Sequence, residues 1–440
     1  MEKAPIYLQA ADRYRKSKSE LSVSEETYVN VFAPVLIEYV TWVLKSATRD
    51  GIQRLYFLSR DGYQMYVAAK YIARSMGIDI DCRYLNVSRY ALRVPEYHLI
   101  QEGCLDRICL GGIDVTFEKV MKRGGLDDKE AEEVAGLCGY ADRLKQVLSY
   151  KQIIGLKEVL YKQGKFLEYV YRHSREAYHS AIGYLTQQGL LETLPYAIVD
   201  SGWTGTLQQT LNNLIASKGE RRQLTGYYFG LYGTPKGSAD TYKAYFFMPR
   251  DGIRRKVHFS NCLFEAVYTS TEGMTLSYGK EAEGYAPVFD SMKNPNEAHI
   301  QENINILKKY LDIYADDICA ENGGFDRQEN KQGLKVVSLL LKQMMGKPSK
   351  EEVLAYGNSL FSDDVLEGQL QKVAAELSDE DIHNQRFLNK ALIMMGLKKG
   401  IIHESAWLEG SIVRNGRSVE SNLRHARLYK YFVYIRKLIR

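Results

Sequence analysis

The chain has 440 residues, of which 45% are hydrophobic and 26% are charged, and its formal net charge is +5. This composition excludes a largely disordered chain, and the length predicts two or three folding units. The charge is too small to predict nucleic-acid binding, so we expect no nucleic acid partner. We find no run of about eighteen apolar residues that would predict a membrane-spanning helix. The first twenty residues lack the apolar segment of a signal peptide, and the six cysteines form no CxxC pair, so we expect a cytoplasmic protein without a structural zinc site.

The first part of the chain predicts the opening of a parallel α/β sheet. We treat residues 1–30 as an N-terminal extension, followed by an apolar helix at 27–45 that is interrupted or started near Pro34. An apolar strand at 51–58 is followed by a polar turn, a helix and a second strand, and these two elements are expected at 63–75 and 78–87.

A long helical insertion is predicted next, at about 97–194. The α/β pattern then resumes with strands at 196–199, 226–231 and 242–247 and a helix at 207–217. Because strands on both sides of an insertion belong to one sheet more easily than to two, we predict a single α/β core over 31–290.

The residues from 291 to 440 predict a mainly helical C-terminal domain, with helices at 297–314, 349–358, 365–377 and 387–397. Residues 424–440 carry six Lys or Arg, no acid, and aromatic residues between the cations. Such a basic amphipathic tail could lie on an anionic membrane surface, at the inner face of the cell membrane. It could equally be a helix that packs on the body of the protein with a solvated basic face.

Two turns carry the residues best suited to ligand binding or catalysis, because each turn follows a strand and opens a helix. Such turns lie where open α/β sheets bind ligands, and the helix start favours an anion. The second turn, in VDSGWTGTLQ, offers two hydroxyls around a glycine, which suits a phosphate monoester. Asp200, just upstream, could accept hydrogen bonds from sugar hydroxyls. The first turn offers Ser59, Arg60 and Asp61, which could bind a pyrophosphate with Mg²⁺.

The second turn resembles the phosphoribosyl-pyrophosphate signature of the phosphoribosyltransferases. The stretch from Pro34 to about Tyr278 further resembles phosphoribosyltransferase-fold glycosyltransferases of bacterial polysaccharide gene clusters, which are often fused to, or labelled as, haloacid-dehalogenase-like hydrolases. The resemblance is carried by LYFLSRDGY, YLNVSRYALRVP, AIVDSGWTGTLQ, TGYYFGLY, LFEAVYTSTEGMTLSY and WLEGS.

The resemblance implies a phosphoribosyltransferase-like, Rossmann-like sheet and transfer of 5-phosphoribose from phosphoribosyl pyrophosphate. The acceptor would be a hydroxyl of a lipid-linked O-antigen or capsule glycan, and a separate haloacid-dehalogenase-type phosphatase would then remove the phosphate. The implied cofactor is Mg²⁺, held by Asp61 and Asp200. The implied donor-binding residues are Ser59, Arg60, Asp61, Gly62, Ser88, Arg89, Ser201, Gly202, Trp203, Thr204, Gly205 and Thr206, and the implied catalytic residues are Asp200, Glu265 and Asp61.

Several alternatives stay open. Arg93 or Arg89 could bind phosphate or form a surface ion pair, and Glu272 and His258 compete with Glu265 as general base. The family signature has paired acids where this chain has Asp200 and Ser201, and its loop is longer.

Two other functions are compatible with the sequence. The first is a haloacid-dehalogenase-like phosphatase of sugar phosphates with Asp61 or Asp200 as nucleophile, although the only D-x-D candidate in the N-terminal part, Asp79 to Asp81, lacks the rest of that motif. The second is a non-catalytic sugar-phosphate-binding scaffold for polysaccharide assembly.

Overall fold

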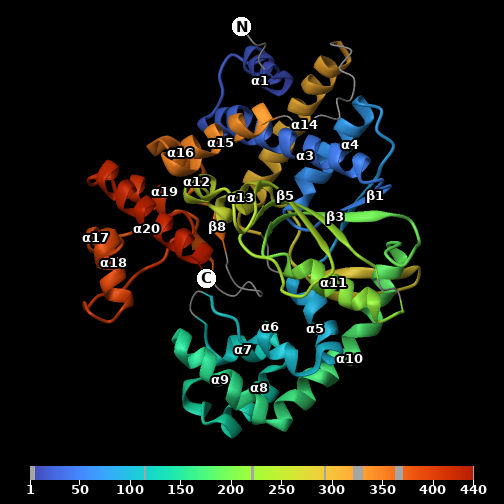
Figure 1. The fold of residues 1–440 in the computed structure, drawn as a ribbon, viewed down its shortest axis with the longest axis vertical. Coiled ribbons are helices and arrows are strands. Elements are labelled where there is room, and N and C mark those ends of the chain that lie inside the picture. The colour runs from blue at the N-terminus through green and yellow to red at the C-terminus, as the bar shows by residue number, and fades with distance from the viewer. Residues whose placement is uncertain are drawn as a thin grey trace.

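A five-stranded sheet with strand order β2-β1-β3-β4-β5 forms the centre of the protein, and all of its strands are parallel (Figure 1). The computed structural model describes residues 5–112, 115–219, 222–291, 294–320, 331–361 and 370–439. The α/β class with a parallel sheet and a helical C-terminal region is thereby confirmed. The strands are β1 (Arg54–Leu58), β2 (Asp81–Leu85), β3 (Tyr196–Trp203), β4 (Thr225–Leu231) and β5 (Thr241–Phe247).

Side chains alternate between the two covered faces of the sheet. Every residue of β1 is buried, as expected for a parallel strand with helices on both sides. Leu55 and Phe57 point into one core, whereas Tyr56 and Leu58 point into another. The β1 register places Phe57 opposite Val199 of β3, and Leu58 opposite Leu85 of β2.

The first face is covered by helices from both ends of the chain. The long N-terminal stretch runs through α2 (Val23–Thr27) and η1 (Tyr28–Phe32) into α3 (Ala33–Arg49). Pro34 lies in the first turn of α3, where its missing N–H costs no hydrogen bond, so it does not break the helix. The other covering helices are α1 (Ile6–Lys16), α4 (Gly62–Ser75), α13 (Asn261–Tyr268), α14 (Glu297–Ala320) and α15 (Lys331–Gly346).

The stretch Val23–Arg49 bears on the expectation that no helix spans a membrane. By length and composition alone it is long and apolar enough to cross a membrane. However, 78% of its apolar window is buried inside the protein, and a mostly buried core helix passes the same test. We interpret it as a core helix.

The second face is covered by α5 (Arg89–Ile100), α10 (Gly164–Gln187) and α11 (Thr206–Ala216). The helices between α5 and α10 bury their own apolar cluster and form the lower lobe in Figure 1. They are η2 (Gln101–Cys104), α6 (Leu105–Ile108), α7 (Phe117–Arg123), α8 (Asp128–Cys138), η3 (Ala141–Arg143) and α9 (Tyr150–Lys162).

The chain after β5 differs from the sequence prediction in several elements. An antiparallel hairpin of β6 (Thr275–Glu281) and β7 (Gly284–Phe289) follows α13, and neither it nor α15 was predicted. The predicted helix at 365–377 lies partly outside the described residues, and its described part is wrong because Gln371–Lys372 form a strand. The remaining elements are α12 (Ile253–Val257), α16 (Lys350–Tyr356), β8 (Leu360–Phe361), β9 (Gln371–Lys372), α17 (Asp379–Asn384), α18 (Phe387–Met394), α19 (Leu408–Asn415) and α20 (Val419–Ile439).

One hydrophobic core joins the two ends of the chain to the sheet. It includes Tyr7 of α1, Phe229 of β4, Leu307 of α14 and Trp407 before α19, all of them buried. The core therefore continues across both predicted boundaries, near residues 30 and 290. The division into extension, core and C-terminal domain stays a prediction.

Candidate functional site

The two turns singled out by the sequence lie side by side at the carboxyl edge of the sheet. Strands β1 and β3 are neighbours, but the helices that follow them, α4 and α11, cover opposite faces. Such a reversal creates a crevice at the strand ends, which is where open α/β sheets bind ligands. A hydrogen bond joins the two turns directly, since the Ser201 hydroxyl donates to Asp61 Oδ2 at a distance of 2.5 Å.

The first turn is held by β2 and by close backbone packing. Ser59 Oγ donates to the carbonyl of Val87 at 2.6 Å and accepts the Val87 N–H at 2.8 Å. The peptide bond between Ser59 and Arg60 is cis. Gly62 opens α4, and a Cβ there would lie 3.0 Å from the Phe57 carbonyl carbon. The predicted donor ligand Ser59 thus positions the turn through its hydroxyl.

Ser88 also has a structural task, since its hydroxyl caps α5 by accepting the Ala91 N–H at 2.9 Å. It donates to the carbonyl of Thr275 at 2.7 Å, which ties the start of α5 to the β6 hairpin. The next residue, Arg89, is exposed at the first turn of α5 and keeps its charge available to the crevice.

Three carboxyl groups from three different elements share this crevice: Asp61, Asp200 and Glu265. Burial, followed by the negative charge of Asp61, raises the pKa of Asp200 to about 7. Burial, followed by the Asp61 and Asp200 charges, raises the pKa of Glu265 to about 8. Burial also raises the pKa of Asp61, against the opposing effects of Ser201, Arg60 and Arg89. All three carboxyl groups are therefore more easily protonated than free carboxyl groups, and Arg60 and Arg89 offset this only in part.

The end of β3 aims Trp203 at Glu265. The Trp203 indole N–H donates to a carboxylate oxygen of Glu265. The backbone makes this possible because Gly202 has φ +122°, and a Cβ on Gly202 would lie 2.2 Å from the carbonyl oxygen of Gly230. Trp203 itself has φ +81°, a rare conformation for a bulky residue that is often found at functional sites.

Thr204, Gly205 and Thr206 form the entrance to α11. Gly205 has φ +61° at the N-cap and supplies no side-chain cap, so the first N–H groups of α11 remain available to a ligand. The hydroxyls of Thr204 and Thr206 lie 3.4 Å apart. This arrangement of backbone donors and two hydroxyls can hold a phosphate group.

Arg93 of α5 points at the same helix start. Its Nη2 lies 3.3 Å from Thr206 Oγ1, and the residue is only 3% exposed. Among the described residues, its Nε and Nη1 have no hydrogen-bond partner. Burial, together with the nearby Arg89 and Arg107 charges, lowers the pKa of Arg93 to about 10. An anion bound at Thr206 would supply the missing acceptor.

The residues fit the implied Mg²⁺. This ion is usually held by one or two carboxylates together with substrate phosphates. Asp61 and Asp200 provide two mutually repelling carboxylates, and a divalent cation would relieve their repulsion. Within the described ranges, no group of three or more His, Cys, Asp or Glu side chains is arranged as a complete metal site. Any Mg²⁺ here would therefore depend on oxygens from the ligand.

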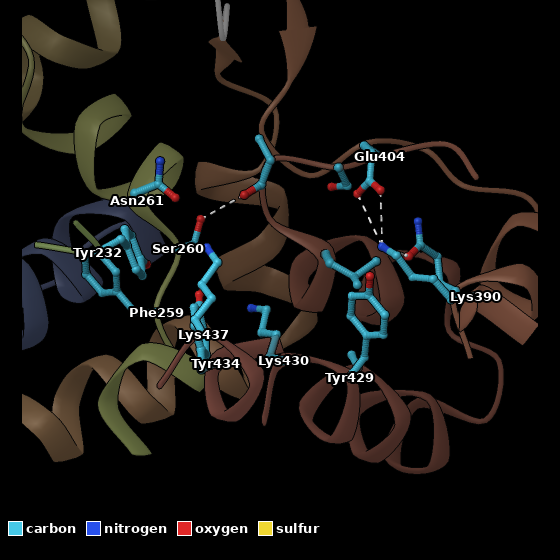
Figure 2. A pocket seen from close by; sticks show the side chains of 15 residues that line it. Tyr232, Phe259, Ser260, Asn261, Lys390, Glu404, Tyr429, Lys430, Tyr434 and Lys437 are labelled. Atoms are coloured by element: carbon cyan, nitrogen blue, oxygen red, sulfur yellow. Dashed lines mark hydrogen bonds and ion pairs between the residues drawn. The ribbon is translucent and has the colours of Figure 1, made fainter. Parts of the chain in front are cut away.

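A cavity of about 340 Å³, which the sequence did not predict, is lined in part by Tyr232 and Phe259, two residues that contact Trp203. Tyr232, the residue after β4, donates its backbone N–H to the Trp203 carbonyl at 2.7 Å. The Tyr232 ring stacks on Tyr434 of α20, with ring centroids 5.9 Å apart. Asn261 lines the cavity one helical turn before Glu265 on the same face of α13. Figure 2 shows Tyr434, Lys430 and Lys437 of α20 below Ser260, and further lining residues include Phe259, Lys390, Glu404 and Tyr429.

The other base and nucleophile candidates lie in less suitable surroundings. Glu272 is exposed, and burial with the Lys342, Arg427 and Lys430 charges lowers the pKa of His258 to about 4, so its ring is a weak base. Asp81 begins β2, at the opposite edge of the sheet, and forms ion pairs with Arg54 and Arg83.

Comparison of the chain with protein-family models and with curated protein sequences finds no match. The resemblance to polysaccharide phosphoribosyltransferases thus remains an inference from the sequence motifs.

Proposed function

We propose that the chain is a glycosyltransferase with a phosphoribosyltransferase-like fold, which moves 5-phosphoribose from phosphoribosyl pyrophosphate to a glycan hydroxyl. The observation that carries this proposal is the incompletely paired Arg93 at the Thr204–Thr206 entrance of α11, beside a crevice that gathers three carboxyl groups. Arg93 has unused donors for an anion, and the carboxyl oxygens can bind a cation. A sugar with a phosphate at one end and a metal-bound pyrophosphate at the other supplies both.

In this proposal the donor's 5-phosphate binds the α11 start and Arg93, and the Asp200 carboxylate accepts hydrogen bonds from the ribose. Arg60 and Arg89 bind the pyrophosphate, next to Asp61. Asp61 and Asp200 would hold Mg²⁺, which would supply neutralising charge for the departing pyrophosphate. Breaking the bond between C1 and the pyrophosphate oxygen leaves positive charge on the ribose ring, which the surrounding carboxylates stabilise.

Glu265 takes the proton of the attacking hydroxyl. The acceptor oxygen forms the new bond to C1, its proton moves to a Glu265 carboxylate oxygen, and pyrophosphate leaves with the electron pair of the broken bond. A carboxylate whose pKa is raised to about 8 holds such a proton well near neutral pH. The Trp203 indole N–H fixes the orientation of the Glu265 carboxylate.

The cavity beside Glu265 is the proposed place of the acceptor. Its aromatic walls and polar groups suit a sugar ring, because stacking and hydrogen bonding are then available together. We propose a cytoplasmic protein that acts on a lipid-linked O-antigen or capsule glycan, with a haloacid-dehalogenase-type phosphatase as a partner in the next step. A phosphatase activity of this chain is disfavoured, since Asp81 of the D-x-D candidate lies at the start of β2 and forms ion pairs with Arg54 and Arg83.

The direct test is mass spectrometry of a synthetic glycan acceptor after incubation with the protein, phosphoribosyl pyrophosphate and Mg²⁺. The proposal predicts a mass gain of one phosphorylated pentose, lost in Glu265→Gln. Release of phosphate without transfer would point to a phosphatase, and an unchanged acceptor together with donor binding would point to a scaffold.

A further inference from the structure

Two helices of the C-terminal region expose large apolar side chains while each turns a lysine inward. In α18, Leu388 is 68% exposed, whereas Lys390 is only 6% exposed. In α20, Leu428, Phe432 and Ile435 are each about half exposed, while the side chain of Lys430 is 22% exposed. A helix normally buries its leucines and exposes its lysines, so an outer face of this kind indicates an apolar partner.

The buried lysines are satisfied on the inner side. Lys390 donates to Gln385 at 2.8 Å and lies 3.2 Å from Glu404, and Lys430 pairs with the buried Glu409 at 2.7 Å. Their burial therefore does not conflict with the fold. The exposed leucines, by contrast, have no such compensation.

The outer faces of α18 and α20 form one surface together with residues 395–401, and we call it the C-terminal apolar surface. Residues 428, 432 and 435 follow the spacing of a single helix face. Phe432 contacts Phe387 at the start of α18, with ring centroids 5.8 Å apart, and Tyr429 lies 3.0 Å from the Met394 sulfur. Between the two helices along the chain, Met395, Leu397 and Ile401 are each more than 60% exposed.

The charge around this surface is mainly positive. Lys399, Arg424 and Arg436 are exposed, whereas Lys390 and Lys430 are turned inward. The exposed acid Glu420 lies at the start of α20, and residues 421–440 contain six Lys or Arg and no acid. An apolar face bordered mainly by cations is complementary to a bilayer that carries anionic headgroups.

We propose that the C-terminal apolar surface binds to anionic lipid membranes, with the exposed apolar side chains of α18, α20 and residues 395–401 inserted among the headgroups. The membrane-facing element is thus a composite of two helices and a loop, rather than the tail 424–440 alone. The inner faces of the same helices line the cavity through Lys390, Tyr434 and Lys437. Membrane binding would therefore hold the cavity next to the bilayer, although the inference itself does not depend on the transfer reaction.

The test is co-sedimentation of the full chain with vesicles of phosphatidylcholine mixed with phosphatidylglycerol, compared with phosphatidylcholine alone. We expect binding to the anionic vesicles that weakens with added salt, and much weaker binding to the neutral ones. The double variant Leu388→Ser with Leu428→Ser should weaken binding at least about tenfold, because two side chains lose their transfer from water. The matched control is Leu137→Ser with Ile154→Ser, two equally exposed positions in α8 and α9, which should bind as the wild type.

The proposal is overturned if the folded protein does not bind anionic vesicles, or if the Leu388/Leu428 variant binds as tightly as the control. Sedimentation velocity tests whether the surface instead binds a second copy of the chain. Self-association that the same double substitution abolishes would assign the surface to such a dimer contact. Calorimetric binding of phosphoribosyl pyrophosphate is measured on the same samples. Its failure would count against the proposed function and leave the membrane inference standing.

Discussion

At the scale of single residues, the site combines a buried arginine that has unused hydrogen-bond donors with three carboxyl groups that share one crevice. Arg93 makes one long hydrogen bond, and the pKa values of three neighbouring carboxyl groups are raised. Such groups reduce the stability of the empty protein, and they persist where a ligand completes them. Two predictions follow from this arrangement.

The first prediction concerns Arg93→Met. Replacing a buried and poorly paired charge with an apolar side chain of similar length should leave the thermal midpoint unchanged or raise it. Affinity for phosphoribosyl pyrophosphate should fall at least about tenfold, because a charge-assisted hydrogen bond to phosphate is lost. Calorimetry and thermal unfolding measure the two effects.

Arg123→Met is the matched control, since Arg123 is also 3% exposed but donates to the backbone carbonyl of Leu110 at 2.5 Å. It should lower the thermal midpoint and leave donor affinity unchanged. Equal losses of affinity in both variants would rule out a specific role for Arg93.

The second prediction concerns pH. The pKa of Glu265 is about 8 in the folded protein and 4.5 without the protein environment, so the folded state binds more protons between these values. The free energy of unfolding without ligand should therefore be highest at the acidic end of this window and fall as the pH rises through about 8. Glu265→Gln should flatten this decline in urea unfolding series, and an unchanged slope would contradict the raised pKa.

The sequence could place these residues but not their energetics. The sequence alone could single out Asp61, Asp200 and Thr204, because each follows an apolar run that predicts a strand. Glu265 was singled out as a base only within a motif, and its bond to Trp203 spans 62 positions of the chain. Within the part of the chain that the structure describes, two of the Arg93 nitrogens have no hydrogen-bond partner because of the side chains that α5, α6 and α11 place around them. A local sequence pattern does not contain this information.

At the scale of elements, the strand-end turns work because glycines permit close backbone approach. Gly202 combines φ +122° with a Cβ position 2.2 Å from a carbonyl oxygen, whereas Gly219 has φ +87° and open space around it. The positive φ angle disfavours any other residue at both positions. At Gly202, unlike Gly219, an added Cβ would also collide with the backbone of β4.

We therefore predict that Gly202→Ala destabilises the protein by about 1–3 kcal/mol more than Gly219→Ala does. Urea unfolding of the two variants measures the difference directly. Gly202→Ala should also reduce donor binding, because the position of Trp203 and the α11 entrance depends on this backbone. Equal destabilisation by the two substitutions would show that the Gly202 approach to Gly230 is unimportant.

The strands were predictable because fully buried parallel strands are continuous apolar runs, as in 54–58 and 225–231. The β6–β7 hairpin was missed because β6 has few apolar residues and both strands are partly exposed. The predicted helix at 365–377 included Gln371–Lys372, which instead pair with Leu360–Phe361. Tertiary pairing overrides local propensity in such short segments.

At the scale of the whole molecule, the C-terminal region shares the core beneath the sheet. Trp407 is fully buried, and its indole N–H donates to the carbonyl of Met345 at 2.8 Å. On the far side of this core, Trp42 of α3 packs its ring on Tyr227 of β4. Continuous packing between these two residues implies that they unfold together.

Trp407→Ala should therefore lower the free energy of unfolding by about 3–5 kcal/mol, the usual cost of deleting a buried aromatic side chain. The remaining tryptophans, Trp42 and Trp203, report the unfolding of the sheet by fluorescence. Their transition should move to lower urea concentration. A transition that stays in place would show that the C-terminal helices fold independently of the sheet.

The proposed function requires that the two turns at the ends of β1 and β3 form one site for a sugar with phosphate groups at both ends. Calorimetric titration of the full chain with phosphoribosyl pyrophosphate, in Mg²⁺ and again in a chelator, tests this most directly. We predict saturable one-to-one binding in Mg²⁺ that weakens at least about tenfold when the metal is removed, since no metal then screens the pyrophosphate from Asp61 and Asp200. No binding, or the same affinity with and without the metal, would contradict it.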